Sequence, residues 1–167
     1  HAYVRRQRQM CIRDRSNLMI QIGRNSKVDT DMVRHMVLNS LKGYRTRFVE
    51  EYGELVLCYD NKGNWRREYF PNYKHGRRKD RKASSLDWGA IFDTLHLIKQ
   101  ELQDNFPYKV LEVENAEADD IIGTLCREYQ DQKTMIISGD KDFIQLQKYD
   151  NVSQYSPITK KMVNGHN

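Results

Sequence analysis

Residues 134–143 have the sequence TMIISGDKDF, in which a short apolar run is followed directly by two aspartates. The run 134–137 has the length and composition of a buried strand. Asp140 and Asp142 then stand where that strand ends. In an α/β sheet, the carboxyl ends of the strands form the edge at which ligands bind. The segment therefore predicts a strand that delivers two carboxylates to a binding edge.

A second acidic cluster lies upstream, in residues 115–122, which have the sequence NAEADDII. Apolar residues at helical spacing predict a helix over residues 116–129, so the cluster falls in its first turn. Glu117 and Asp119 are candidate ligands at the same edge as the first pair. Asp120 points about 100° away from Asp119 on a helix, so a supporting or capping role and metal contact both stay open for it.

The rest of the chain alternates predicted helices and strands. Helices are expected at residues 31–52, 87–104 and 143–146, strands at 55–59, 108–113 and 152–155, and a turn near Pro157 before 160–163. Ser84 or Ser85 is expected near the start of the second helix. Residues 61–82 are polar and basic, which predicts a helical arch or a disordered loop. This alternation is typical of an α/β fold with a mostly parallel central sheet flanked by helices.

A further acidic position, Asp60, follows the strand predicted at residues 55–59. Strand ends and the helix start then give an oxygen-only set of candidate metal ligands: Asp60, Glu117, Asp119, Asp140 and Asp142. Such a set, without His or Cys, suits Mg²⁺ or Mn²⁺, and two ions about 4 Å apart can cleave a phosphodiester. Each residue taken alone also fits a turn, a cap or the positive end of a helix dipole.

The bulk properties describe one domain of a water-soluble protein. The chain has 167 residues, 31% of them charged, and its mean hydropathy is −0.86. Since no apolar stretch approaches the roughly 20 residues that span a membrane, no membrane association is expected. Cys11, Cys58 and Cys126 are odd in number and widely spaced, which favours reduced thiols and a cytoplasmic protein.

Positive charge is concentrated in the middle of the chain. Residues 66–82 contain eight Lys or Arg and two acidic residues, within a net charge of +5 for the whole chain. A polyanion is the natural partner of such a segment. Four aromatic residues are interleaved with the basic ones: Trp65, Tyr69, Phe70 and Tyr73. They either stack on bases or pack the base of the loop.

Residues 1–15 have the sequence HAYVRRQRQMCIRDR, with five arginines and no apolar periodicity. The absence of an apolar core of 7–15 residues excludes a signal peptide. A basic nucleic-acid-binding arm is one interpretation. The ending MCIRDR resembles translated adapter sequence, so we predict that residues 1–15 are a non-native or artefactual segment outside the fold.

Two motifs together resemble a known family. EADD at residues 117–120, followed by IISGDKDF at 136–143, resembles the 5′-nuclease (flap endonuclease) superfamily. Further likeness, strongest to phage members that remove RNA primers during DNA replication, lies in residues 33–40, 57–61, 65–67 and 149–157. The resemblance covers residues 16–163. It implies a PIN-like α/β catalytic domain that uses Mg²⁺ or Mn²⁺, two ions at a time, to hydrolyse DNA flaps and RNA–DNA duplexes from their 5′ ends.

The resemblance also assigns roles to particular positions. Metal binding falls on Asp60, Glu117, Asp119, Asp140 and Asp142. The family's YKxxR pattern falls on Tyr73, Lys74 and Arg77, which makes Lys74 and Arg77 the catalytic residues at the scissile phosphate. Nucleic-acid contact is implied for Arg66, Arg67, Tyr73, Lys74, Arg77, Arg78, Lys79, Arg81 and Lys82. The implied partners are DNA and RNA–DNA hybrids with 5′ ends or flaps, and a single-strand-binding protein or sliding clamp, with the enzyme a monomer in the cytoplasm of the host cell.

The chain departs from the family pattern at both ends. Asp14 stands in register with the family's first metal-binding aspartate, but it belongs to the segment 1–15. The chain ends at Asn167, before the family's Gly-Asp-x-x-Asp-Asn segment and its helix–three-turn–helix motif. Residues 16–167 are therefore expected to be a truncated N-terminal catalytic domain, without the region that grips duplex DNA.

Two other functions stay open. An Asp-x-Asp pair after an apolar strand can also provide the nucleophile of a phosphatase-like hydrolase. That interpretation gives no role to the basic loop or to Glu117 and Asp119. The other is a nucleic-acid-binding module whose metal site is inactive, which would bind single-stranded ends without cleaving them.

Overall fold

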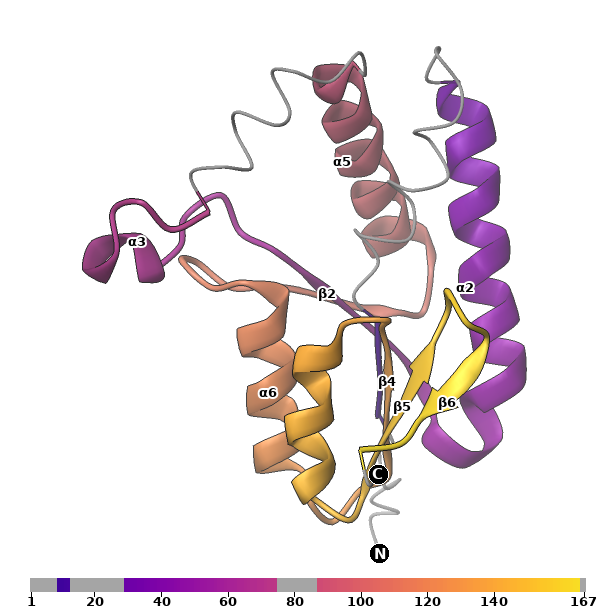
Figure 1. Cartoon of the computed structure of the whole chain (residues 1–167). Coiled ribbons are helices and arrows are strands. Elements are labelled where there is room, and N and C mark those ends of the chain that lie inside the picture. The colour runs from indigo at the N-terminus through magenta and orange to yellow at the C-terminus, as the bar shows by residue number, and fades with distance from the viewer. Residues whose placement is uncertain (1–8, 13–28, 75–86, 166–167) are drawn as a thin grey trace, which may run out of the picture.

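The computed structural model describes residues 9–12, 29–74 and 87–165, and for 9–12 it describes the backbone alone. Its strands form one sheet in the order β3-β2-β1-β4-β5-β6. The strand bounds are β1 (Gln9–Ile12), β2 (Glu54–Tyr59), β3 (Lys109–Glu112), β4 (Thr134–Ile137), β5 (Val152–Ser156) and β6 (Lys161–Val163). Neighbouring strands run parallel except β5 and β6, which run antiparallel. The expected mostly parallel sheet is confirmed (Figure 1).

Helices connect the strands, as the sequence predicts. They are α2 (Thr30–Tyr52), α3 (Arg66–Tyr69), α5 (Trp88–Asn105), α6 (Ala118–Glu128) and the 3₁₀ helix η1 (Lys141–Lys148). Asp87 caps helix α5, and its carboxylate accepts from the Ala90 backbone N–H at 3.0 Å. The cap is thus Asp87, while the expected Ser84 and Ser85 lie outside the described residues. No described helix combines the length and the apolar character needed to cross a membrane.

The sheet has a core on each face, because successive strand residues point to opposite sides. In β2, Leu55 and Leu57 pack with buried residues of α2 and α5. Val56 and Cys58 pack with buried residues of α6 and with Phe143 of η1. Figure 1 shows these two pairs of helices on opposite faces of the sheet, so the domain has three layers. Within the described part, Cys58 and Cys126 are buried, and the reduced state of the thiols stays a prediction.

Residues 9–12 lie at the centre of the sheet, and this corrects the sequence-based exclusion of residues 1–15 from the fold. Strand β1 pairs with β2 through Met10 and Leu55, and with β4 through Met10 and Met135. Four residues flanked by arginines carry no local strand signal. The two neighbouring strands supply the backbone partners that make this segment a strand. The non-native origin of residues 1–15 stays a prediction.

The strand order defines one binding edge. From β1 the chain order runs outward through β2 and β3 on one side and through β4, β5 and β6 on the other. The switch therefore lies between β1 and β4, and ligands of α/β sheets bind at the carboxyl ends of the strands beside such a switch. Strand β4 ends at Ile137, paired with Ile12, so Asp140 follows at this point. Asp14 lies outside the described residues.

Candidate metal centre and nucleic-acid interface

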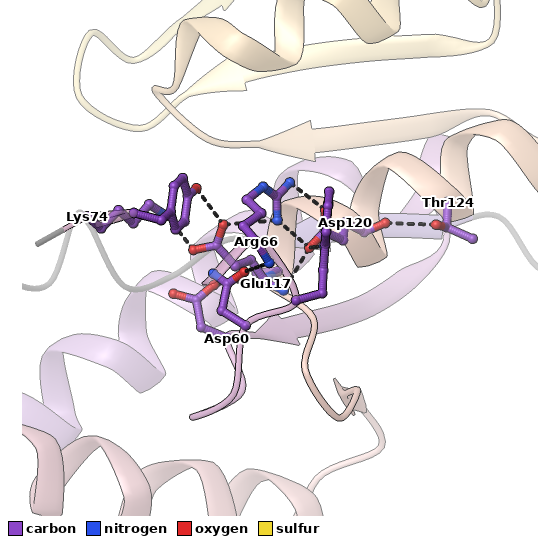
Figure 2. A network of polar contacts seen from close by, with 10 residues as sticks. Asp60, Arg66, Lys74, Glu117, Asp120 and Thr124 are labelled. Carbon is purple, nitrogen blue, oxygen red and sulfur yellow. Dashed lines mark hydrogen bonds and ion pairs between the residues drawn. The ribbon is translucent and has the colours of Figure 1, made fainter. Parts of the chain in front are cut away.

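Asp60 and Glu117 meet at the start of α6. Asp60 directly follows β2, and its Oδ1 accepts from the Ala118 backbone N–H at 2.9 Å. Glu117 is the residue before Ala118 and caps α6. The segment after β2 therefore runs along the start of α6, and two of the predicted ligands lie next to each other (Figure 2).

Asn61 ties the two segments together. Its Oδ1 accepts from the backbone N–H groups of Gly63 at 3.0 Å and Asn115 at 3.2 Å. Its Nδ2 donates to Glu112 Oε1 at 3.0 Å. Asn115 has a φ of 59°, a left-handed conformation that asparagine tolerates better than most residues. One amide side chain thus joins the loops that follow β2 and β3 and keeps Asp60 beside α6.

The close approach at Gly63 gives a stability prediction. A methyl group on Gly63 would lie 2.0 Å from Asn115 Oδ1. We expect Gly63→Ala to lower the free energy of unfolding by about 1 kcal/mol, because the Asn115 side chain has to move. Urea denaturation measures this change.

Two further variants serve as controls for Gly63→Ala. Adding Asn115→Gly removes the obstructing side chain and suits the positive φ, so it should restore most of the lost stability. Gly43 lies inside α2 with nothing within 4 Å of an added Cβ, so Gly43→Ala should instead stabilise by about 1 kcal/mol. A Gly63→Ala protein as stable as the parent would contradict the contact.

Glu112, the last residue of β3, gives a pH-dependent prediction. A hydrogen bond from Lys99 holds the pKa of the Glu112 carboxyl below its ordinary value, with smaller help from Asn61 and against the effect of burial. A lowered pKa means that the stabilisation is fully present above the ordinary glutamate pKa of about 4.3 and is lost as the pH falls through the folded-state pKa. Glu112→Gln should therefore cost up to about 1 kcal/mol at pH 7. Denaturation curves at several pH values should show this difference shrinking below pH of about 4, whereas a difference that does not change with pH would contradict the ion pair.

Glu117 is buried among cationic and hydroxyl groups. Its side chain accepts from Lys74 Nζ and, at 2.9 Å, from Tyr73 Oη, and Arg66 Nη1 lies 3.2 Å from Oε2. Burial alone would raise the pKa of the Glu117 carboxyl, but the bonds from Lys74 and Tyr73 and the charges of Lys74 and Arg66 lower it overall. Lys74 has a φ of 55°, a backbone conformation unusual for lysine. Glu117 is thus ionised and held by the base of the basic segment.

Asp120 is a cap and an ion-pair partner. Its Oδ2 accepts from the Glu117 backbone N–H at 2.9 Å, which closes the first turn of α6. Arg66 donates to both Asp120 oxygens, at 2.8 and 2.7 Å, and Trp65 Nε1 donates to Oδ2 at 3.2 Å. Burial opposes ionisation of Asp120, yet the bonds from Arg66 and from the Glu117 backbone leave its pKa below the ordinary value. Of the roles left open for Asp120, the structure shows the capping one.

Arg66 was expected to contact nucleic acid, but in the structure its guanidinium already binds carboxylates of the protein. The bidentate bond to Asp120 raises the pKa of the guanidinium above its ordinary value. The same guanidinium lies 4.6 Å from the Trp65 ring centroid. Arg66 therefore fastens α3 to the start of α6. Of the other residues expected to contact nucleic acid, Arg67 is exposed on α3, while Arg77, Arg78, Lys79, Arg81 and Lys82 lie outside the described residues.

Asp140 caps η1 in the turn after β4. Its Oδ1 accepts from the Asp142 backbone N–H at 3.0 Å, and its own N–H donates to Ser138 Oγ at 3.1 Å. Gln154, a β5 residue only 1% exposed, donates to the backbone oxygens of Ser138 at 2.9 Å and Asp140 at 2.8 Å. The buried side-chain amide of Gln154 thus fixes the backbone of the turn that carries Asp140.

The structure sorts the five predicted metal ligands into two groups. Asp60 and Glu117 meet at the start of α6, with Asp119 in the same first turn, while Asp140 and Asp142 share the turn after β4. In residues 29–74 and 87–165, no three Asp, Glu, His or Cys side chains are grouped closely enough to hold one ion. The assignment of these five residues as metal ligands therefore stays a prediction.

The fit of a metal ion can be tested on the donors themselves. All five candidates are carboxylates, which suits a hard divalent cation. The arrangement fits less well at Glu117, where Lys74, Tyr73 and Arg66 already occupy the carboxylate. A cation at this carboxylate would take the place of the Lys74 ammonium.

Sequence reasoning missed two residues that shape the site. Asn61 and Gln154 carry no charge and match no catalytic motif, yet they fix the loops that hold Asp60 and Asp140. Gln154 carries no local signal in the sequence, because its strand VSQYS also contains Ser153 and Ser156. Its burial, and with it the need for hydrogen-bond partners, appears only in the structure.

The three-layer fold brings Asp60 and Glu117 together at one edge of the sheet, in contact with Lys74 of the basic segment. A model of the 5′-3′ exonuclease N-terminal resolvase-like domain matches residues 16–166. The chain belongs to this family.

Two curated relatives support the assignment. The chain is 39% identical over 153 residues to ribonuclease H of Enterobacteria phage T4, a match that covers 89% of this chain and 50% of that protein. It is 33% identical over 100 residues to DNA polymerase I of Bacillus caldotenax, covering 58% of this chain and 10% of that protein. The chain thus spans about half the length of the phage T4 relative.

Solved structures show the same fold. The phage T5 5′-exonuclease with bound divalent zinc ions matches with a TM-score of 0.67 at 20% identity, over 94% of this chain and 58% of that one. A T5 flap endonuclease in a pseudo-enzyme–product complex with DNA and metal ions matches with a TM-score of 0.62 at 21% identity, over 94% and 58% of the two chains.

Proposed function

We propose that this chain is the catalytic domain of a Mg²⁺-dependent 5′→3′ exonuclease and flap endonuclease. It hydrolyses phosphodiester bonds in DNA flaps and RNA–DNA duplexes and removes primers in phage DNA replication. One observation carries the proposal: Asp60 and Glu117 meet at the carboxyl edge of the sheet, where Lys74 of the basic segment contacts Glu117. The relatives support the choice of substrate, since one is named a ribonuclease H and another was solved with DNA and metal ions.

The acidic residues would hold the cation. Asp60, Glu117 and Asp119 would bind it from the start of α6, and Asp140 and Asp142 from the turn after β4. Two Mg²⁺ or Mn²⁺ ions bound there would supply activation of a water molecule and stabilisation of the leaving oxygen. The capping bond of Asp120 and the loop-bridging bonds of Asn61 keep the first group in place. The bonds from Gln154 keep the second.

Lys74 and Arg77 would neutralise the phosphate that is cleaved. Lys74 reaches the acidic edge from the base of the basic segment, where it pairs with Glu117. A substrate phosphate offers the ammonium group a second anion at the same place, and hydrogen bonds between charged groups of this kind are the strong ones. Arg77 lies outside the described residues, and its role is taken from the family's YKxxR pattern.

The test is cleavage of a labelled 5′ flap. The 167-residue chain is incubated with a 5′-flap duplex in Mg²⁺, in Mn²⁺ and in EDTA, with a 3′-flap duplex as control. We expect short 5′ products from the 5′-flap duplex with either metal. The 3′-flap duplex should not be cleaved, and in EDTA neither duplex should be cleaved. A second arm uses a chimera in which residues 16–166 replace the matching segment of phage T4 ribonuclease H, because that protein is about twice as long as the match.

The two arms separate the possible functions. Cleavage by the chimera alone means that the domain is a nuclease whose activity needs the remaining half. DNA binding without cleavage in both arms supports a nucleic-acid-binding module with an inactive metal site and refutes the nuclease. Turnover of a small phosphate ester with a trapped aspartyl phosphate supports a phosphatase-like hydrolase instead.

A further inference from the structure

Three exposed aromatic side chains gather on and beside helix α3. Trp65 is 43% exposed, Tyr69 72% and Phe70 67%. The other exposed large apolar residues of the described chain are spread over helices, strands and turns between residues 32 and 162: Met32, Leu97, Val113, Tyr129, Ile158 and Met162. Single exposed apolar residues are ordinary, whereas a contiguous apolar patch marks an interaction site. We call Trp65, Tyr69 and Phe70 the aromatic patch.

The aromatic patch is attached to the acidic edge through Trp65. Trp65 Nε1 donates to Asp120 at 3.2 Å, and the Arg66 guanidinium lies 4.6 Å from the centre of the Trp65 ring. The Trp65 and Tyr69 rings stand edge to face, 6.0 Å apart with 76° between their planes. Trp65 therefore anchors the patch to Asp120 in the first turn of α6, directly after the cap residue Glu117.

The charges around the patch favour a polyanion. Residues 61–74 contain four basic residues and one acidic residue, Glu68. Arg66 and Lys74 have carboxylate partners. Lys62 and Arg67 are exposed, and neither forms a salt bridge within the part of the chain that the structure describes. A purely apolar protein partner would leave these two cations unpaired, whereas a single nucleic-acid strand offers phosphates for the cations and flat bases for the rings.

We propose that the aromatic patch is a stacking site for unpaired bases of a single-stranded nucleic acid that enters or leaves the acidic edge. This inference rests on the proposed function and adds to it a place for the unpaired strand outside the metal site. Stacking on an aromatic side chain tolerates any base, because every base has a π face. The site would therefore recognise the presence of bases and not their sequence.

The test compares strands with and without bases. Binding of the full chain to a labelled oligothymidylate and to an abasic strand of equal length is measured by fluorescence anisotropy in EDTA, so that no cleavage occurs. Both strands carry the same phosphates, so the ratio of their affinities isolates stacking. We expect the parent to prefer oligothymidylate by at least about fivefold, and the double variant Tyr69→Leu/Phe70→Leu to bring the ratio close to one.

The control is Tyr129→Leu, which removes an exposed tyrosine at the other end of α6. It should leave the ratio unchanged. A parent that does not distinguish the two strands, or a double variant that still does, would overturn the stacking site. In a Trp88→Phe background, Trp65 is the one remaining tryptophan, and its emission should be quenched by oligothymidylate and not by the abasic strand. Because these measurements involve no cleavage, they fail or succeed separately from the flap assay that tests the proposed function.

Discussion

Asp140→Asn is expected to reduce Mg²⁺-dependent cleavage of a 5′ flap by at least about a hundredfold, because a metal-bound carboxylate contributes several kcal/mol of charge stabilisation. Asparagine has nearly the same shape as aspartate, and its Oδ1 can still accept from the Asp142 N–H. The bonds from Gln154 reach backbone oxygens, which the substitution leaves in place. The loss should therefore come from charge and not from misfolding. Initial cleavage rates at saturating Mg²⁺, together with the melting temperature, measure the two effects.

The matched control for Asp140→Asn is Asp150→Asn. Asp150 precedes β5 and so lies at the amino ends of the strands, across the sheet from the binding edge, where it is exposed. Its substitution should change the cleavage rate by less than about twofold, since substitutions of exposed residues away from a functional site have small effects. Equal rates for Asp140→Asn and the parent would remove Asp140 from the metal site.

Arg66→Ala is expected to be the most destabilising single change at the base of the basic segment, at about 1–3 kcal/mol. Removing one partner of a largely buried ion pair leaves the other charge without compensation, although partial exposure of both side chains reduces the cost. Asp120 would lose two short hydrogen bonds, and Glu117 a neighbouring positive charge. Urea denaturation at pH 7 measures the change.

Two comparisons test the origin of that loss. Arg127 and Glu128 form an ion pair with side chains 63% and 57% exposed, so Arg127→Ala should cost less than about 1 kcal/mol. Arg66→Ala combined with Asp120→Asn should cost clearly less than the sum of the two single changes, because both remove the same interaction. Additive losses would mean that Arg66 stabilises the protein through its packing on Trp65.

Local patterns in the sequence predicted most elements of the fold. The helix expected at residues 31–52 is α2 (Thr30–Tyr52), and the strand expected at 134–137 is β4 (Thr134–Ile137). These segments have strong periodicity or a continuous apolar run, so neighbouring residues suffice to define them. Strand β1 was missed, because its four residues become a strand through backbone pairing with β2 and β4, segments more than 40 residues away.

The sequence by itself determined that acidic residues lie at the carboxyl ends of β2 and β4 and at the start of α6, because strand and helix boundaries are local properties. Only the tertiary structure decided what those carboxylates contact. Glu117 pairs with Lys74, 43 positions away, and Asp120 with Arg66, 54 positions away. Such pairs depend on how the loops after β2 and β3 are joined through Asn61. Spacing along the chain carries no information about that junction, since it is set by hydrogen bonds between distant segments.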